Sequence, residues 1–374
     1  MKISGLIVAA GLSSRMKDFK PLMKIENKPL ILNTINSLRQ SQIEDINIVV
    51  GYRGKEIEEC LKDENVNIIY NENYNSSFMY DSFKIGLSQI SKKCDAVVFL
   101  PGDIGFVSKY TLDLLINEIN KKEKKIVYPI YKDIVGHPPI ISSKCFDYLL
   151  SYEGENGLKG GMDNFKDESI KISTPDKFIL FDMDTKEDFH RVKEDFESRN
   201  ILSYENCLFL LSYFEVPQNI IKHSKKVSEI CIDLCYELNK HKYNLDINLI
   251  ESSSLLHDIK RAEKNHAEAG ANLLRDLGHE KIADVVKSHM RIEKHMEDDI
   301  NEKTILYFGD KLVIEDKYVD LDKRFKEKLS EYKYNDEIKN NIMKKYNTAL
   351  KIKSNIISII GNEEYEKLEE KWRG

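Results

Sequence analysis

The chain has 374 residues, of which 41% are hydrophobic and 32% are charged, and its 57 Lys and Arg against 63 Asp and Glu give a formal net charge of −6. At about 150 residues per domain, this length predicts about two to three globular domains. The mildly acidic charge excludes the basic surface typical of general nucleic-acid-binding proteins. No apolar run approaches the roughly 18 residues of a membrane span, so we expect neither nucleic acid nor a membrane as a partner.

The N-terminus and the cysteines bear on the compartment. The first apolar run is short and leads into a Gly/Ser-containing loop, which indicates a core strand rather than a signal peptide. The six cysteines are scattered and form no CxxC pair, a pattern typical of reduced thiols. We therefore expect a cytoplasmic protein.

Residues 1–198 alternate between short apolar runs and amphipathic stretches. The expected strands are 3–9, 46–50, 66–70, 96–100, 126–129 and 179–181, with helices such as 30–38 and 81–90 between them. This alternation predicts a doubly wound α/β domain with a mostly parallel sheet. Such sheets bind ligands outside the carboxyl ends of their strands, so residues that follow the strands are the candidates for chemistry.

From about residue 205 the pattern becomes helical. Val227, Ile230, Leu234 and Leu238 recur on one helical face together with His223. Two histidines precede this point and seven follow it. We expect a nucleotide-binding domain over 1–198 and an all-α domain over 204–374.

The first strand leads into a loop of small residues, Ala9 to Met16, with Lys20 shortly after it. Such a loop directs backbone N–H groups at one point and binds phosphate, and Arg15 and Lys20 would add positive charge. The spacing matches neither the Rossmann nor the Walker pattern. An ordinary turn between strand and helix with two surface cations is the alternative interpretation.

Acidic residues follow two further apolar segments. Asp103 ends Phe-Leu-Pro-Gly-Asp, and Asp182 and Asp184 follow the expected strand 179–181, where alternation would place both on one face. Carboxylates at strand ends suit Mg²⁺, which prefers oxygen ligands and shares substrate phosphates. The alternative is that Asp103 caps a helix starting near Ser108, and that Asp184 or Thr185 caps another.

Four motifs in order, LIVAAGLSSRM with Lys20, LPGD, GHPPI and DMDT, resemble the molybdenum-cofactor nucleotidyltransferases over roughly residues 3–195. The resemblance implies a doubly wound α/β fold and Mg²⁺-dependent transfer of a nucleotide from CTP or GTP to a pterin phosphate, with release of pyrophosphate. Ala9-Ala10-Gly11 matches the cytidylyl branch, so we expect CTP and a molybdopterin-type phosphate acceptor.

The resemblance also implies residue roles. Asp103 and Asp184 would bind Mg²⁺ and, with Arg15 and Lys20, form the catalytic set. The nucleotide would contact Ala9, Ala10, Gly11, Ser13, Ser14, Arg15, Lys20, Asn73, Ser82 and Gly102, with Gly86 in the segment that lines the base pocket, and Gly136, His137 and Pro138 would lie near the acceptor.

The sequence departs from the family at Lys17, at Phe78-Met79 and at Gly105. These departures leave the base and the acceptor open. The acceptor could instead be a sugar or alcohol phosphate. The first domain could also be a nucleotide sensor without transfer activity that regulates the second.

The second half carries an adjacent His257 and Asp258 at the end of an apolar helix. Both could face one metal ion, although a single such pair is common by chance and a lone core histidine such as His223 is common too. The pair has further companions of metal-ligating type at His266, His289 and Asp310.

This ordered set resembles the HD-domain metal-dependent phosphohydrolases over about residues 215–325, closest to bacterial members that hydrolyse nucleotide phosphate esters or anhydrides. The resemblance implies that His223, His257, Asp258 and Asp310 hold one metal, and that His266 and His289 share Asp258 to hold a second. Imidazole and carboxylate ligands suit Fe, Mn, Zn or Ni, and a metal pair would activate water, with Asp258 as a catalytic residue.

Two further residues of this half, Lys260 and His295, each allow two interpretations. Lys260 would bind the phosphate or be a solvated lysine, and His295 would be a substitute ligand or a loop residue. His241 and His279 are expected at the surface. The whole chain is thus predicted to be a bifunctional enzyme, a nucleotidyltransferase fused to a phosphohydrolase.

Overall fold

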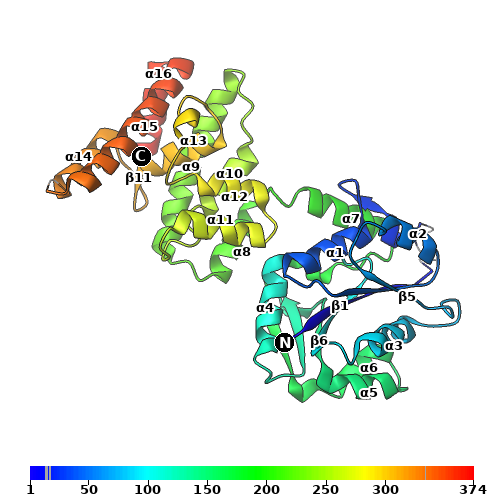
Figure 1. Cartoon of the computed structure of the whole chain (residues 1–374). Coiled ribbons are helices and arrows are strands. Elements are labelled where there is room, and N and C mark those ends of the chain that lie inside the picture. Colours follow the sequence, from blue (N-terminus) through cyan, green and yellow to red (C-terminus); the bar gives the residue numbers. More distant parts are fainter. Residues whose placement is uncertain (13–15, 17, 333) are drawn as a thin grey trace. The chain divides into compact units, whose positions relative to one another are not determined.

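The computed structural model describes residues 1–12, 16, 18–332 and 334–374. The chain divides into two compact units, Met1–Glu197 and Ser198–Gly374, each with its own hydrophobic core (Figure 1). The predicted site residues Ser13, Ser14 and Arg15 lie outside the described residues. Within the described ranges, no helix is both long and apolar enough to cross a membrane.

The first unit is built on one sheet with the strand order β10-β7-β9-β6-β1-β4-β5, and β8 pairs with β7. Its strands are β1 (Ile3–Ala9), β4 (Ile46–Val50), β5 (Asn67–Tyr70), β6 (Ala96–Pro101), β7 (Ile126–Tyr131), β8 (Ile134–Val135), β9 (Ile140–Ser142) and β10 (Ser169–Ser173). The strands β6, β1, β4 and β5 are parallel neighbours, whereas β9 runs antiparallel to β6 and β7. The carboxyl ends of the four parallel strands therefore share one edge, and the predicted α/β class is confirmed.

Helices cover both faces of this sheet (Figure 1). The face that carries Ile7 packs against α1 (Leu30–Gln40), α2 (Gly54–Cys60) and α4 (Lys109–Asn120). The opposite face, which carries Leu6, packs against α3 (Met79–Ile90), α5 (Phe146–Ser151) and α6 (Gly157–Asp163). Because Leu6 and Ile7 are both fully buried, β1 is a continuous apolar run rather than an alternating one.

Smaller elements complete the unit. A 3-10 turn, Lys20–Leu22, precedes the hairpin of β2 (Lys24–Ile25) and β3 (Lys28–Pro29). The unit ends with α7 (Lys186–Glu197), whose Phe189 and Val192 are buried in a small apolar cluster.

The predicted strand 179–181 is wrong. Residues Lys177–Leu180 form a 3-10 helix, which begins where the Asp176 carboxylate accepts a hydrogen bond from the N–H of Phe178 (2.9 Å). Ile179 is 1% exposed, so its apolar character reflects burial beneath a turn. Because this segment is not a strand, strand alternation does not place Asp182 and Asp184 on one face.

The described residues of the second unit form helices and one short hairpin, which confirms the predicted class. Its helices are α8 (Tyr204–Tyr213), α9 (Gln218–Lys240), α10 (Ile247–Leu256), α11 (His266–Asp276), α12 (Glu280–Lys287), α13 (Glu302–Lys311), α14 (Leu321–Glu331), α15 (Asp336–Ile360) and α16 (Asn362–Arg373). The hairpin of β11 (Val313–Ile314) and β12 (Lys317–Tyr318) is antiparallel. The predicted apolar face of α9 is fully buried at Val227, Ile230, Leu234 and Leu238, and this face fixes the side of α9 that turns inward.

Candidate functional sites

In the first unit, Lys20 joins two acids that are distant in sequence. Its Nζ donates to Asp103 Oδ2 (3.2 Å), which follows β6, and to Asp184 Oδ1 (3.1 Å), which precedes α7. The side chains of Lys20 and Asp103 are 13% and 16% exposed, whereas that of Asp184 is 44% exposed. The structure therefore brings the three predicted residues to one half-buried point at the carboxyl edge of the sheet.

A third acid, Asp182, is affected by the charges of these two. Burial raises the pKa of the Asp182 carboxyl, and the neighbouring charges of Asp184 and Asp103 raise it further. Burial alone would lower the pKa of the Lys20 ammonium. Asp103 and Asp184 outweigh burial, so this pKa is raised. Three carboxylates thus converge where a cation would relieve their repulsion.

Ser108 and Thr185 make capping contacts in the two helices that follow these acids. Ser108 caps α4, because its side chain accepts from the N–H of Thr111 (3.3 Å). At the start of α7, the N–H of Asp188 donates to the Thr185 hydroxyl (3.1 Å), and the N–H of Thr185 donates to Asp188 (3.0 Å). The cap of α4 is thus Ser108 rather than Asp103, and of the two caps considered for α7 it is Thr185 that makes the contact.

A pocket of about 220 Å³ adjoins Lys20 and Asp103. Predicted site residues in its wall are Ala9, Ala10, Gly11, Lys20, Ser82, Gly102 and Asp103, and the remaining wall includes Tyr74, Ser77, Phe78 and Met79. Gly102 is a close-approach position, because a Cβ there would lie 2.8 Å from the Cβ of Ala9. The pocket thus links the loop after β1, the start of α3 and the end of β6.

Two predicted residues of the base segment do not line this pocket. Asn73 donates its N–H to the buried Asn71 Oδ1 (3.0 Å), and Asn71 Nδ2 in turn donates to Ser77 and Ser82 (2.9 Å each). Asn71 was missed in the sequence, yet it fixes two hydroxyls of the wall. Gly86 packs on the sheet, since a Cβ there would lie 2.5 Å from Leu6.

The loop at Gly136 packs against the turn that leads to the acids. The N–H of His137 donates to the carbonyl of Ile179 (2.8 Å), and a Cβ on Gly136 would lie 2.3 Å from that carbonyl oxygen. Burial lowers the pKa of His137, and the charge of Asp182 opposes this shift. The loop that resembles the acceptor segment therefore lies beside the acidic group.

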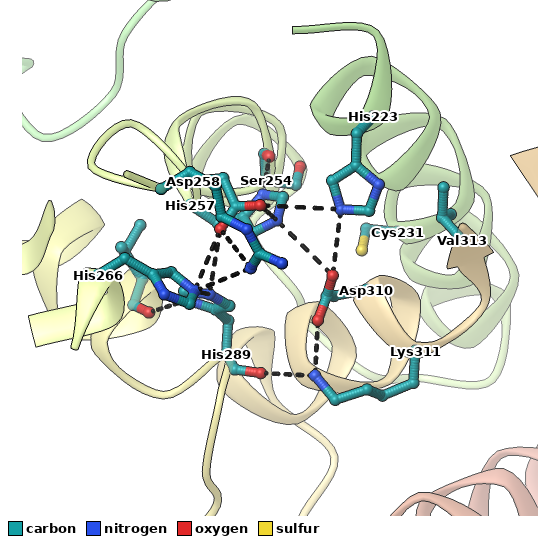
Figure 2. A network of polar contacts seen from close by, with 12 residues as sticks. His223, Cys231, Ser254, His257, Asp258, His266, His289, Asp310, Lys311 and Val313 are labelled. Carbon is teal, nitrogen blue, oxygen red and sulfur yellow. Dashed lines mark hydrogen bonds and ion pairs between the residues drawn. The ribbon is translucent and has the colours of Figure 1, made fainter. Parts of the chain in front are cut away.

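In the second unit, six predicted ligands from α9, α11, α13 and the ends of α10 and α12 come together (Figure 2). His223 Nε2 lies 3.2 Å from Asp310 Oδ1 and 4.0 Å from Asp258 Oδ2. His257 Nε2 lies 3.4 Å from Asp258 Oδ2 and 3.8 Å from Asp310 Oδ1. We call these four residues the first cluster.

Asp258 also faces a second group of histidines. Its Oδ1 lies 3.4 Å from His266 Nε2 and 3.6 Å from His289 Nε2, and the two imidazole nitrogens are 3.3 Å apart. We call Asp258, His266 and His289 the second cluster. Asp258 is 2% exposed and turns one oxygen to each cluster, so it lies between them.

Backbone carbonyls orient three of the imidazoles. Nδ1 of His223 donates to Glu315 O (2.8 Å) in the β11–β12 turn, Nδ1 of His257 to Ser254 O (2.7 Å), and Nδ1 of His289 to Val286 O (2.7 Å). A carbonyl can only accept, so Nδ1 carries a proton and Nε2 is the atom left to face the clusters, which is the orientation that metal-binding histidines need.

The charges inside the two clusters also fit a metal ion. The Nε2 of His257 is buried and has no hydrogen-bond partner within the described residues. Burial alone would raise the pKa of Asp258 and Asp310. The charge of His257 lowers the pKa of Asp258, and the charge of Lys311 lowers that of Asp310. Both carboxyl pKa values fall as a result. Burial lowers the pKa of His266 to about 4. Ionised carboxylates and a neutral imidazole are the ligating forms.

Several nearby cations had no signal in the sequence. Lys311 Nζ donates to Asp310 Oδ2 (2.6 Å) and His289 O (3.0 Å), and Arg261 Nη1 lies 3.5 Å from Asp258 and 3.1 Å from His266. Lys260 pairs with Glu263 (2.9 Å) rather than with the clusters.

The remaining histidines of this unit lie outside both clusters. His295 is exposed beside Glu293 (3.4 Å), and His241 is also exposed. His279 donates through Nδ1 to Arg199 O (2.6 Å). A substitute ligand role for His295 is therefore excluded by its position.

Comparison with known families finds a match in each of the two units. Residues 5–168 match the MobA-like NTP transferase domain, and residues 220–315 match the HD domain. The chain therefore joins a MobA-like NTP transferase domain to an HD domain. NTP transferases use Mg²⁺ and HD domains bind divalent metals, in keeping with the acids of the first unit and the clusters of the second.

Individual relatives match only part of the chain. The Escherichia coli molybdenum cofactor cytidylyltransferase is 26% identical over 193 residues, which are 51% of this chain and 96% of that protein. The bifunctional protein GlmU of Clostridium tetani is 29% identical over 157 residues, but the match spans 27% of its length. The crystal structure of Rv0371c from Mycobacterium tuberculosis matches 52% of this chain and 98% of its own, with 22% identity and a TM-score of 0.46.

Proposed function

We propose that the first unit transfers a nucleotidyl group from CTP to a small acceptor that bears a phosphate, of the molybdopterin type, and releases pyrophosphate. The observation that carries this proposal is the meeting of Lys20, Asp103 and Asp184 at 3.1–3.2 Å beside a pocket at the strand ends. The relative in Escherichia coli and the Ala9-Ala10-Gly11 loop favour CTP over GTP.

Each residue has a positional task in this reaction. Asp103 and Asp184 would hold Mg²⁺, which neutralises the charge of the nucleotide phosphates. Lys20 would exchange its carboxylate partners for phosphate oxygens, and the small residues of the first loop would admit the nucleotide close to the backbone. An oxygen of the acceptor phosphate then forms a bond to the α-phosphorus while the bond to pyrophosphate breaks.

Pyrophosphate release tests this assignment. Wild-type protein with Mg²⁺, CTP and a molybdopterin phosphate should release pyrophosphate, and Asp103→Ala should reduce the rate by at least 100-fold. Ser88→Ala, on the exposed side of α3, is a matched control and should keep the rate. Tight CTP binding without release for any acceptor would instead support a nucleotide sensor.

A second acceptor class has specific support. The choline-phosphate cytidylyltransferase of Haemophilus influenzae is 36% identical over 88 residues, although these cover 38% of that protein. An alcohol or sugar phosphate is therefore the second candidate acceptor. Pyrophosphate release with such a phosphate, and none with a pterin phosphate, would select it.

For the second unit, we propose metal-dependent hydrolysis of a phosphate ester or anhydride of a nucleotide. The two clusters would hold one or two ions of Fe, Mn, Zn or Ni, which lower the pKa of bound water and clamp the phosphate. Asp258 would bridge the ions, and the carbonyl-bound imidazoles would keep their Nε2 atoms aligned. Phosphate release that requires one of these metals and is lost in His257→Ala tests the assignment.

A further inference from the structure

Asp176 is a buried acid of the first unit that has no part in the proposed reaction. It follows β10 in the chain and is 6% exposed. The nearby Thr174 is fixed to β7, because its N–H donates to the carbonyl of Ile130 (2.9 Å). A buried carboxylate is costly unless it is hydrogen-bonded, so the partners of Asp176 indicate what it does.

Each oxygen of Asp176 accepts a backbone N–H from a different segment of the chain. Oδ2 accepts from Ser108 (2.7 Å), the residue that caps α4. Oδ1 accepts from Phe178 (2.9 Å), in the 3-10 helix Lys177–Leu180. The Thr111 hydroxyl donates a third hydrogen bond, to Oδ2 (3.0 Å). Asp176 therefore joins the segment that leads into α4 to the segment that leads into α7.

These two segments carry acids of the candidate site. Asp103 lies between β6 and α4, and Asp184 lies between the 3-10 helix and α7. The segments also pack against each other, since the rings of Phe106 and Phe178 are 6.1 Å apart in one apolar cluster. The hydrogen bonds of Asp176 thus connect the backbone that positions Asp103 to the backbone that positions Asp184.

Lys20 connects the same two acids at their carboxylates, at 3.2 Å from Asp103 and 3.1 Å from Asp184. In the proposed reaction Lys20 turns to the nucleotide phosphates, and the two carboxylates then repel each other unless a cation lies between them. The hydrogen bonds of Asp176 involve neither Lys20 nor these carboxylates. They therefore hold the two segments together independently of Lys20.

We propose that Asp176 is a positioning residue for the Mg²⁺ site of the first unit. By holding the segment of Asp103 to the segment of Asp184, it keeps both carboxylates within reach of one ion after Lys20 has turned to the phosphates. Asp176 itself contacts neither the ion nor the nucleotide. This inference rests on the proposed nucleotidyl transfer, which supplies the Mg²⁺ and the CTP.

Calorimetric titration of CTP, with Mg²⁺ and with EDTA, tests the inference without turnover. The full chain carries Asp258→Asn throughout, so that the second unit contributes little metal binding. Adding Asp176→Asn turns an NH2 group toward one of the two N–H donors in either orientation of the amide. The factor by which Mg²⁺ tightens CTP binding should fall at least fivefold, whereas the CTP affinity in EDTA should change less than twofold.

The matched control is Thr111→Val, which removes a hydroxyl from the same buried network and leaves both N–H contacts of Asp176 in place. Mg²⁺ should tighten CTP binding in this variant as in wild type, within twofold. A merely structural role would lower the melting temperature of both variants and leave the Mg²⁺ effect unchanged. An unchanged Mg²⁺ effect in Asp176→Asn, or an equal loss in Thr111→Val, would overturn the inference.

Hydrogen exchange of the unmutated chain is a second measurement, which decides the matter if Asp176→Asn does not fold. An ion held by both acids should stabilise the contact between their segments. Mg²⁺ with CTP should therefore slow exchange of the Ser108 and Phe178 amides at least threefold more than CTP with EDTA does. Exchange at these two amides that does not respond to Mg²⁺ would contradict the positioning role.

The outcomes separate this inference from the transferase itself. If Mg²⁺ tightens CTP binding equally in Asp176→Asn and wild type, while pyrophosphate release requires Asp103, only the positioning role fails. If the Mg²⁺ effect depends on Asp176 but no acceptor yields pyrophosphate, the positioning role stands and the transferase proposal fails. CTP binding that is indifferent to Mg²⁺ in the chain with Asp176 intact would overturn both.

Discussion

At the scale of single residues, Asp258 is the group on which both clusters of the second unit depend. Its Oδ2 faces His223 and His257, and its Oδ1 faces His266 and His289. An isosteric amide keeps the shape but removes the negative charge that a bridging ligand supplies.

We therefore expect Asp258→Asn to weaken metal binding in both clusters at least tenfold, and His266→Ala to remove only the ion of the second cluster. Metal content after dialysis against trace metal, measured by mass spectrometry, checks both. Equal losses in the two variants would contradict a bridging role for Asp258.

Lowering the pH should release metal from the first cluster before it releases metal from the second. The charges of Asp258 and Asp310 outweigh burial and raise the pKa of His257 above 6.5, so protons compete with metal there even near neutral pH. Burial lowers the pKa of His266 to about 4, so that imidazole stays neutral well below pH 6.

Lowering the pH from 7.5 to 5.5 should thus release the ion of the first cluster and retain that of the second. Metal content across a pH series measures this, with His266→Ala as the control that should lose all metal in the same interval. Retention of metal by that variant at pH 5.5 would show the order to be reversed.

The sequence indicates the ligands better than their supports. His257 and Asp258 stand out because polar metal-ligating residues follow an apolar helix. Lys311 and Asn71 do not stand out, because a lysine after an aspartate or an asparagine after a strand has no distinctive spacing. Their roles depend on contacts with His289 O and Ser82, which only the fold creates.

At the scale of elements, the last helix supports the metal site through the hairpin. Trp372 of α16 is 1% exposed, its Nε1 donates to Asp233 Oδ2 (3.0 Å), and its ring lies 5.7 Å from that of Tyr318 in β12. The turn between β11 and β12 supplies the Glu315 carbonyl that orients His223.

Trp372→Ala should destabilise the second unit by about 3–5 kcal/mol, the usual cost of emptying a buried tryptophan site. Trp372→Phe should cost less, because it keeps most of the apolar volume. Urea unfolding monitored by far-ultraviolet circular dichroism measures both, and an Ala variant as stable as wild type would show that α16 does not support the unit.

The sequence predicted the strands that are buried along their whole length. It failed for short segments in which only single residues are buried. The strands β1, β4 and β6 are buried on both faces and mostly apolar, so their sequences stand out. The three-residue β9 is too short to show a period. Ile179 lies in an apolar run that matches a strand, yet the Asp176 cap turns this segment into a 3-10 helix.

At the scale of the whole molecule, the two units hold separate sets of chemical groups. The acids and Lys20 belong to Met1–Glu197, and both metal clusters belong to Ser198–Gly374. The contacts described above join residues within one unit in each case, so each proposed activity should depend on its own unit.

Asp103→Ala should abolish nucleotidyl transfer and leave phosphate hydrolysis within twofold, and His257→Ala should do the reverse. Parallel assays of pyrophosphate and phosphate release on the same preparations check this pair. Loss of both activities in either folded variant would contradict separate sites.

The most direct test of the account is a thermal-shift experiment with CTP, GTP, ATP and UTP, each with and without Mg²⁺. A nucleotide at about 100 times its Kd stabilises its binding unit by about 2.7 kcal/mol. The account predicts a Mg²⁺-dependent shift, largest for CTP, that disappears in Asp103→Ala. No shift with any nucleotide, or the same shift in that variant, would contradict a nucleotide site built on Asp103, Asp184 and Lys20.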